Sequence, residues 1–67
     1  MQRYRDAIED YTVALVYQPD YAAAYYNRAI AKNYLKESAG ACEDLNKAEN
    51  LGMKVEPRMK DLFCKKE

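Results

Sequence analysis

The residues of this chain that could do chemistry are its two cysteines and two pairs of neighbouring carboxylates. Cys42 and Cys64 lie at matching distances on either side of the turn near Met53, so antiparallel packing of the flanking segments could join them in a disulfide. Such a bond would stabilise a small domain in an oxidising compartment, whereas a free cysteine is an ordinary small apolar core residue. We favour the second interpretation and expect two reduced packing thiols.

These residues are not suited to zinc binding or to acid–base catalysis. Structural zinc sites take four ligands from Cys and His, and the chain has two cysteines and no histidine. Glu9 with Asp10 and Glu43 with Asp44 are adjacent in sequence, so the members of each pair point in different directions around a helix and are expected on solvated faces. The sequence shows no Gly-rich phosphate loop and no nucleophile with a base beside it. We therefore predict that the chain is not an enzyme and holds no metal or cofactor.

Charge and hydropathy argue against two further classes of partner. Eleven basic and eleven acidic residues cancel, whereas nucleic acids and anionic lipids are bound by clustered Lys and Arg. Stacking of the seven tyrosines on single-stranded RNA would also require a positive groove. No apolar run approaches the length of a membrane span, and the first 20 residues lack the apolar stretch of a signal peptide. Neither nucleic acid nor a membrane is expected as a partner, and the localisation stays unknown.

The elements that must position any site are helices. Four segments show the hydrophobic spacing of amphipathic helices, near residues 3–17, 21–35, 38–51 and 56–65. Pro19 ends the first segment, Asp20 and Ser38 are expected as the N-caps of the second and third, and Gly52 is expected to close the third in a left-handed conformation. Pro57 suits the first turn of the last segment. The sequence predicts an all-α chain of about four antiparallel helices.

An internal repeat relates the first and third segments. At an offset of 34 residues, Ala7-Ile8-Glu9-Asp10 aligns with Ala41-Cys42-Glu43-Asp44, and Tyr11 and Ala14 align with Leu45 and Ala48. The two segments are therefore predicted to be copies of one element. A period of this length that contains a helix, a turn and a second helix is typical of one repeat family.

These residues resemble the tetratricopeptide repeat (TPR). The aromatic, small and closing proline positions of the repeat's second helix are occupied by Tyr4, Ala7, Tyr11, Ala14 and Pro19. Residues 22–35 resemble the first helix of the next repeat, and residues 38–51 resemble its second helix. The resemblance covers about residues 3–52 and implies a helix-turn-helix solenoid fragment, with 1–20 as the second helix of one repeat and 21–53 as one full repeat.

Three positions depart from the family pattern. Lys36 stands where the family usually has a turn glycine, Ser38 replaces an aromatic residue, and Met53 replaces the closing proline. These departures suggest that the array is ending. Residues 54–67 are then expected to be a C-terminal capping helix that covers the apolar face of the last repeat, in a single TPR-like domain of residues 1–67.

The resemblance implies a protein-interaction scaffold, because the first helices of such arrays line a concave surface on which partners usually bind. In this chain only the segment near 21–35 is a first helix. Five of its side chains are predicted to form the protein-binding site, namely Tyr26, Asn27, Ile30, Asn33 and Tyr34. Aromatic rings supply contact area, and amides can bind both donors and acceptors of a peptide backbone. The expected partner is a protein or peptide.

A structural role is the alternative. The same five side chains could instead contact a neighbouring repeat, and the chain would then be a capping or homo-oligomerisation element of a longer TPR protein without a ligand of its own. Tyr4, Ile8, Tyr11 and Leu15 also lack the neighbour that a complete first repeat would supply, so we expect self-association at high concentration. An architecture of this kind identifies neither the partner nor the pathway.

Overall fold

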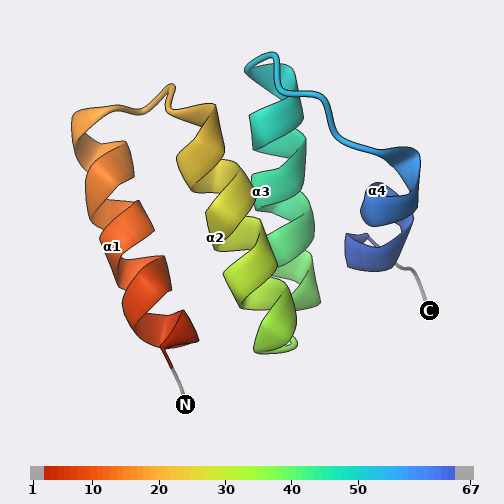
Figure 1. Cartoon of the computed structure of the whole chain (residues 1–67), viewed down its shortest axis with the longest axis horizontal. Helices are drawn as coiled ribbons and strands as arrows, with labels where there is room; N and C mark the ends of the chain where they lie inside the picture. The colour runs from red at the N-terminus through yellow and green to blue at the C-terminus, as the bar shows by residue number, and fades with distance from the viewer. Residues whose placement is uncertain (1–2, 65–67) are drawn as a thin grey trace.

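The computed structural model describes residues 3–64, and all regular structure within this range is helical (Figure 1). The helices are α1 (Tyr4–Tyr17), α2 (Ala22–Tyr34), α3 (Ser38–Asn50) and α4 (Pro57–Phe63). The predicted all-α fold and its four helices are therefore confirmed. The last helix ends at Phe63, two residues before the expected end, and Lys65 lies outside the described residues. Among the described residues, no helix is long and apolar enough to cross a membrane.

The three longer helices lie side by side and alternate in direction (Figure 1). The central helix of this row, α2, contacts both α1 and α3, and the short α4 packs against α3. The loop from α3 to α4 brings the chain back along the bundle, so α4 runs opposite to α3 (Figure 1). The result is the predicted helix-turn-helix solenoid fragment, in which each helix packs mainly on its neighbours in the sequence.

Small side chains form most of the buried core. Alanines on α2 and α3 allow the two helix backbones to approach closely, and Leu45 is the largest side chain that is fully buried. One cluster joins α2, α3 and α4, and its buried members are Ala29, Ala41, Leu45 and Phe63. Around this cluster pack the half-buried residues Tyr26, Ile30, Val55 and Met59. Because a chain of this size rarely obtains more than ~3–5 kcal/mol from such a core, additional links between helices matter.

The two predicted N-caps are wrong. The N-cap positions of α2 and α3 are Tyr21 and Glu37, and neither makes a side-chain capping hydrogen bond. The Tyr21 N–H donates to the carbonyl of Gln18 at 3.1 Å, which closes the backbone turn before α2. Ser38 is already the first residue of α3. The backbone turns between helices, rather than side-chain caps, thus set where α2 and α3 begin.

Both α2 and α3 end in the same hydrogen-bonded turn, a Schellman motif. After α2, the Glu37 N–H donates to the Lys32 carbonyl at 2.9 Å and the Lys36 N–H donates to the Asn33 carbonyl at 3.0 Å. After α3, the corresponding donors are Met53 and Gly52. The motif requires a left-handed residue, which is Gly52 (φ +103°) after α3, as predicted, but Lys36 (φ +63°) after α2. Lysine therefore occupies a position where glycine is the favourable residue.

This difference between equivalent turns predicts opposite effects of two substitutions. Lys36→Gly is expected to raise the free energy of unfolding by about 1 kcal/mol, because it removes the clash of a Cβ in the left-handed region. Gly52→Ala is expected to lower it by about 1 kcal/mol, and this cost is backbone strain alone because nothing lies within 4 Å of the added Cβ. Urea denaturation followed by circular dichroism measures both. A Lys36→Gly variant that is no more stable than the parent chain would contradict the assignment of backbone strain to Lys36.

Candidate functional site

Two tyrosines from different helices stack at the open edge of the α1–α2 pair. Tyr4 begins α1 and Tyr34 ends α2, so the antiparallel arrangement brings them together. Their ring centroids are 4.7 Å apart with an angle of 12° between the planes. The stack is still accessible, since Tyr4 is 39% exposed and Tyr34 is 61% exposed. The two stacked rings therefore form a rigid aromatic surface that is partly open to solvent.

A pocket of about 180 Å³ lies between α1 and α2, next to this stack. Its lining consists of side chains from both helices, namely Tyr4, Ala7, Tyr11, Asn27, Ile30 and Ala31. None of these residues is charged, and Asn27 supplies the only amide among them. We call this pocket, together with the stacked ring of Tyr34, the α1–α2 groove.

The structure separates the five predicted binding residues. Asn27 and Ile30 line the pocket, and Tyr34 joins it through its stack on Tyr4. Tyr26 is half-buried on another side of α2, where its hydroxyl donates a hydrogen bond to Met59 Sδ of α4 at 3.5 Å. Asn33 is half-buried and does not belong to the pocket lining. Three of the five therefore share one groove, while Tyr26 belongs to the contact with α4.

Sequence reasoning missed the half of the groove that comes from α1. The sequence predicts that Tyr4 and Tyr11 lack a neighbour and favour self-association, and it assigns no binding role to Ala7, yet all three line the pocket. An available signal was the expected antiparallel pairing, which places the first turn of α1 beside the last turn of α2.

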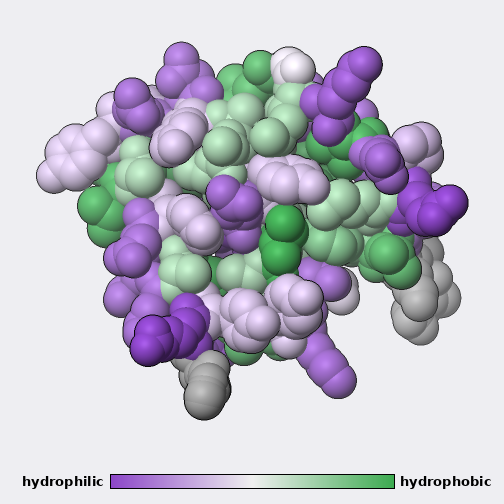
Figure 2. All heavy atoms as spheres, in the orientation of Figure 1, coloured by the Kyte–Doolittle hydropathy of each residue, from purple (hydrophilic) through white to green (hydrophobic). Residues whose placement is uncertain are grey.

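In the view of Figure 2, weakly polar and apolar residues make up most of the surface over α2, with a strongly hydrophilic group among them. Most of the other strongly hydrophilic residues lie toward the edges. Arg28 and Lys32 of α2 do not face the pocket, because both side chains bind Asp44 of α3. The groove therefore has little charge of its own with which to attract a charged ligand.

The environment of Asp44 corrects a sequence prediction. A solvated position was expected, but Asp44 is only 4% exposed and is the buried charged residue of the core. The Arg28 guanidinium binds it through two hydrogen bonds, Nε to Oδ2 at 2.7 Å and Nη2 to Oδ1 at 2.8 Å. Lys32 Nζ lies 3.3 Å from Oδ2. The position is buried because α2 lies directly over this side of α3, which the sequence of α3 alone does not reveal.

Arg28 links three helices. Besides Asp44 of α3, its Nη1 donates to the hydroxyl of Thr12 on α1 at 3.1 Å, and its guanidinium lies 5.5 Å from the centre of the Tyr25 ring. The hydrogen bonds to Asp44 raise the pKa of Arg28 above its ordinary value, although burial acts in the opposite direction. This ionic cluster (Arg28, Lys32 and Asp44) links α2 to α3. The hydrogen bond from Arg28 to Thr12 links α2 to α1, the two helices whose side chains line the groove.

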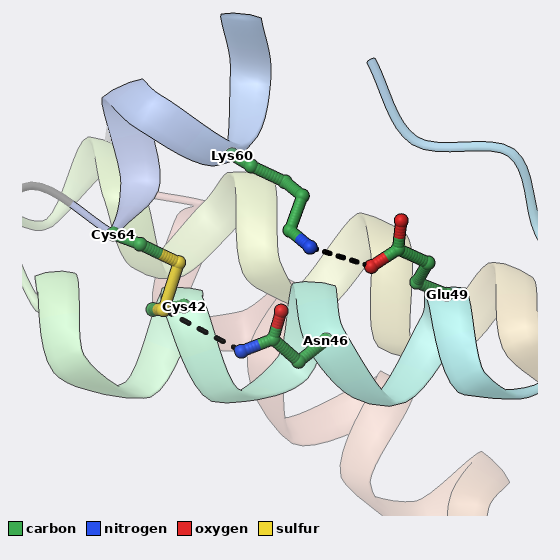
Figure 3. Close-up of a disulfide and its surroundings, with 5 residues drawn as sticks. All are labelled: Cys42, Asn46, Glu49, Lys60 and Cys64. Atoms are coloured by element: carbon green, nitrogen blue, oxygen red, sulfur yellow. Dashed lines mark hydrogen bonds and ion pairs between the residues drawn. A yellow bond between two sulfur atoms is a disulfide. The ribbon is translucent and has the colours of Figure 1, made fainter. Parts of the chain in front are cut away.

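A disulfide joins Cys42 of α3 to Cys64, the residue that follows α4. The expectation of two reduced thiols is thus wrong for this structure. Figure 3 shows why the pair is possible: α4 lies along α3, and the two Cα atoms are only 4.9 Å apart. In the same contact, Lys60 Nζ lies 2.7 Å from Glu49 Oε1, and Asn46 Nδ2 donates to Cys42 Sγ at 3.7 Å (Figure 3). Among the described residues, no group of three or more His, Cys, Asp or Glu side chains is placed to hold a metal ion.

Comparison of the chain with protein-family models, with curated proteins and with solved structures gives no match.

Proposed function

We propose that this chain is a protein-binding module of TPR type, and that its α1–α2 groove holds an apolar, uncharged segment of a partner protein. The observation that carries the proposal is the uncharged pocket between α1 and α2, continued by the exposed stack of Tyr4 and Tyr34. The repeat pattern described above supports the same interpretation, because first helices line the binding surface of such arrays.

The chemistry of the lining favours this class of ligand. Tyrosine rings offer a large contact area with few rotatable bonds, which keeps the entropic cost of binding low. Asn27 is exposed, and its amide can both donate to and accept from a ligand backbone. A charged ligand group would lose its hydration in the pocket without gaining an opposite charge, which is unfavourable. The preferred segment is therefore apolar, with its backbone polar groups free to meet Asn27.

A second candidate function is self-association through the outer face of α1. Val13, Val16 and Tyr17 are 54%, 71% and 79% exposed, and they lie within five consecutive residues of one helix. Exposed apolar residues grouped in this way are typical of contact surfaces. Under this alternative the chain caps or joins copies of itself, and the groove has no ligand.

Tyr34→Ala separates the two candidates. Peptides selected from a random displayed library against the full chain are expected to be apolar and uncharged. Their dissociation constants, measured by fluorescence polarisation, should rise about tenfold in the Tyr34→Ala variant, which corresponds to the loss of one aromatic contact. The variant should keep the circular dichroism spectrum of the parent chain, because Tyr34 is largely exposed.

Tyr17→Ala is the matched control, since it removes an exposed tyrosine that lies outside the groove. It should leave peptide binding unchanged. Selected peptides that are strongly charged, or equal losses in the two variants, would contradict the proposal. If Tyr17→Ala instead lowers the molecular mass seen by light scattering while Tyr34→Ala does not, self-association through α1 is favoured.

A further inference from the structure

We propose that the face of α2 and α3 beneath α4 is a docking site for an amphipathic helix of another protein, and that the Cys42–Cys64 disulfide keeps α4 in this site until a dithiol reductant opens it. This site is distinct from the α1–α2 groove, and the inference does not depend on the function proposed for that groove. We refer to the covered surface as the α4 site, formed by Tyr26, Ala29, Ala41 and Leu45.

α4 is held in place by its neighbours rather than by its own stability. It has seven residues, and a helix of that length does not persist alone in water. Phe63 is 5% exposed and packs in the cluster with Ala29, Ala41 and Leu45. Met59 accepts the hydrogen bond from the Tyr26 hydroxyl. The disulfide at the end of α4 supplements these few contacts with a covalent link to α3.

The α4 site would not remain exposed to water without cost. Ala29, Ala41 and Leu45 are each 0% exposed and pack with Phe63 in one cluster, so the departure of α4 removes Phe63 from this apolar surface. Burial of such a surface is the main favourable contribution to helix docking. An opened α4 site therefore favours another helix of similar chemistry.

The contacts of α4 define that chemistry. Its two inward side chains, Met59 and Phe63, are four residues apart and so lie on one helical face. Lys60, next to Met59, meets Glu49 of α3 at 2.7 Å (Figure 3). A matching partner helix carries a methionine or aliphatic residue, an aromatic residue four positions later, and a lysine or arginine directly after the first of these. Glu49 selects for that cation because an acidic residue there would be repelled.

The disulfide is accessible to a reductant. Both cysteines are half-buried rather than buried, and they line a surface pocket of about 420 Å³ together with Ser38 and Asn46. A reductant thiolate can attack a disulfide only along an open approach to one of its sulfur atoms. The pocket provides such an approach at the end of α4.

The reaction is a two-electron thiol–disulfide exchange. One thiolate of the dithiol bonds to Cys64 Sγ, the Cys42–Cys64 bond breaks, and its electron pair leaves on Cys42 Sγ. Asn46 Nδ2, which already donates to this atom, stabilises the departing thiolate before it takes a proton from solvent. The second thiolate of the reductant then displaces Cys64, which leaves as a thiolate and is protonated in turn. The dithiol is oxidised to its own disulfide, and both protein thiols are free.

Loss of the link weakens the hold on α4 substantially. The closed loop spans 22 residues, and the entropy of closing a loop of that size makes docking of α4 roughly a hundredfold less favourable after reduction. Amide hydrogen exchange of residues in α4 should accelerate by about this factor, while circular dichroism should show that α1, α2 and α3 remain helical.

The binding test uses the full chain and a synthetic probe. The probe is a fluorescein-labelled peptide of residues 53–64 with Cys64→Ser, which carries the contacts of α4 but cannot form a disulfide. Fluorescence polarisation should show no binding to the oxidised chain and clear binding after dithiothreitol is added. In the reduced Phe63→Ala chain the probe should bind about tenfold more tightly than to the reduced parent, because the chain's own α4 competes less well.

Two controls assign the effect to the proposed contacts. A Cys42→Ser chain should bind the probe with or without reductant, because it cannot form the disulfide. A Lys60→Glu probe should bind at least tenfold more weakly than the parent probe, because it brings a carboxylate to Glu49.

Four outcomes would overturn the proposal. These are equal binding of the probe to the oxidised and reduced chains, hydrogen exchange of α4 that is unchanged by reduction, loss of helicity in α1 to α3 on reduction, and a reduced chain that forms dimers by light scattering without the probe. The last result would assign the α4 site to a second copy of this chain.

Discussion

Replacement of Asp44 by alanine is expected to lower the free energy of unfolding by about 3 kcal/mol. The carboxylate is 4% exposed and neutralises two cations. Its removal leaves the Arg28 guanidinium, whose side chain is only 16% exposed, without a counter-charge and without two hydrogen bonds. Urea denaturation followed by circular dichroism measures the loss.

A double substitution tests whether the cost comes from an unpaired charge. Arg28→Met combined with Asp44→Leu removes both members of the pair and replaces them with apolar side chains of similar volume, so its stability should be close to that of the parent chain. Lys32 can then extend its amine to solvent, since its side chain is already 21% exposed. An Asp44→Ala variant that stays within about 0.5 kcal/mol of the parent would show that the ionic cluster contributes little.

The same cluster has a consequence for the groove. Arg28 contacts Thr12 of α1 as well as Asp44 of α3, so it helps to fix α2 between its two neighbours. The pocket depends on that alignment, because its lining comes from both α1 and α2. Under the proposed function, stability and ligand binding are therefore coupled through residues outside the pocket lining.

Removal of the disulfide is expected to lower the free energy of unfolding by a similar amount. The Cys42→Ala/Cys64→Ala variant should lose about 3 kcal/mol of stability, because the unfolded chain is no longer constrained by a 22-residue loop. Thermal unfolding by calorimetry or circular dichroism should show a lower midpoint. Alanine is a suitable replacement since it leaves a small apolar side chain at each position.

Reduction of the parent chain provides the matched comparison. Dithiothreitol should lower the thermal midpoint of the parent chain to that of the alanine variant and should leave the variant unchanged. A parent chain whose unfolding does not respond to reductant, or a variant as stable as the oxidised parent, would show that the bond adds nothing to the docking of α4.

The helices themselves could be predicted because their signals are local. Pro19 cannot continue a helix and Gly52 readily takes the left-handed conformation, so each marks an end from its own covalent structure. The buried stripe of α3 also followed from spacing, since Ala41, Leu45 and Ala48 lie on one face of any helix that contains them. The starts of α2 and α3 were less predictable, because backbone turns placed Tyr21 and Glu37 at the N-cap positions.

The predicted binding residues included the α2 half of the groove but not the α1 half. Asn27, Ile30 and Tyr34 share one helical face by spacing alone. Tyr4 and Tyr11 lie beside them because of the register between α1 and α2. Tyr26 lies on another face of α2, where it contacts Met59 of α4. A helical period specifies directions around one axis, but it does not specify which neighbour lies in each direction.

By itself, the sequence determined the helical class, the order of the helices and the repeated small-residue stripe that lets them pack, because these depend on interactions within a few residues. Only the tertiary structure decided that Asp44 is buried beneath Arg28, that Cys42 meets Cys64, and that a pocket opens between α1 and α2. Each of these features depends on the distance between two helices, and a change of one residue in helix register rotates a side chain by about 100° from its partner.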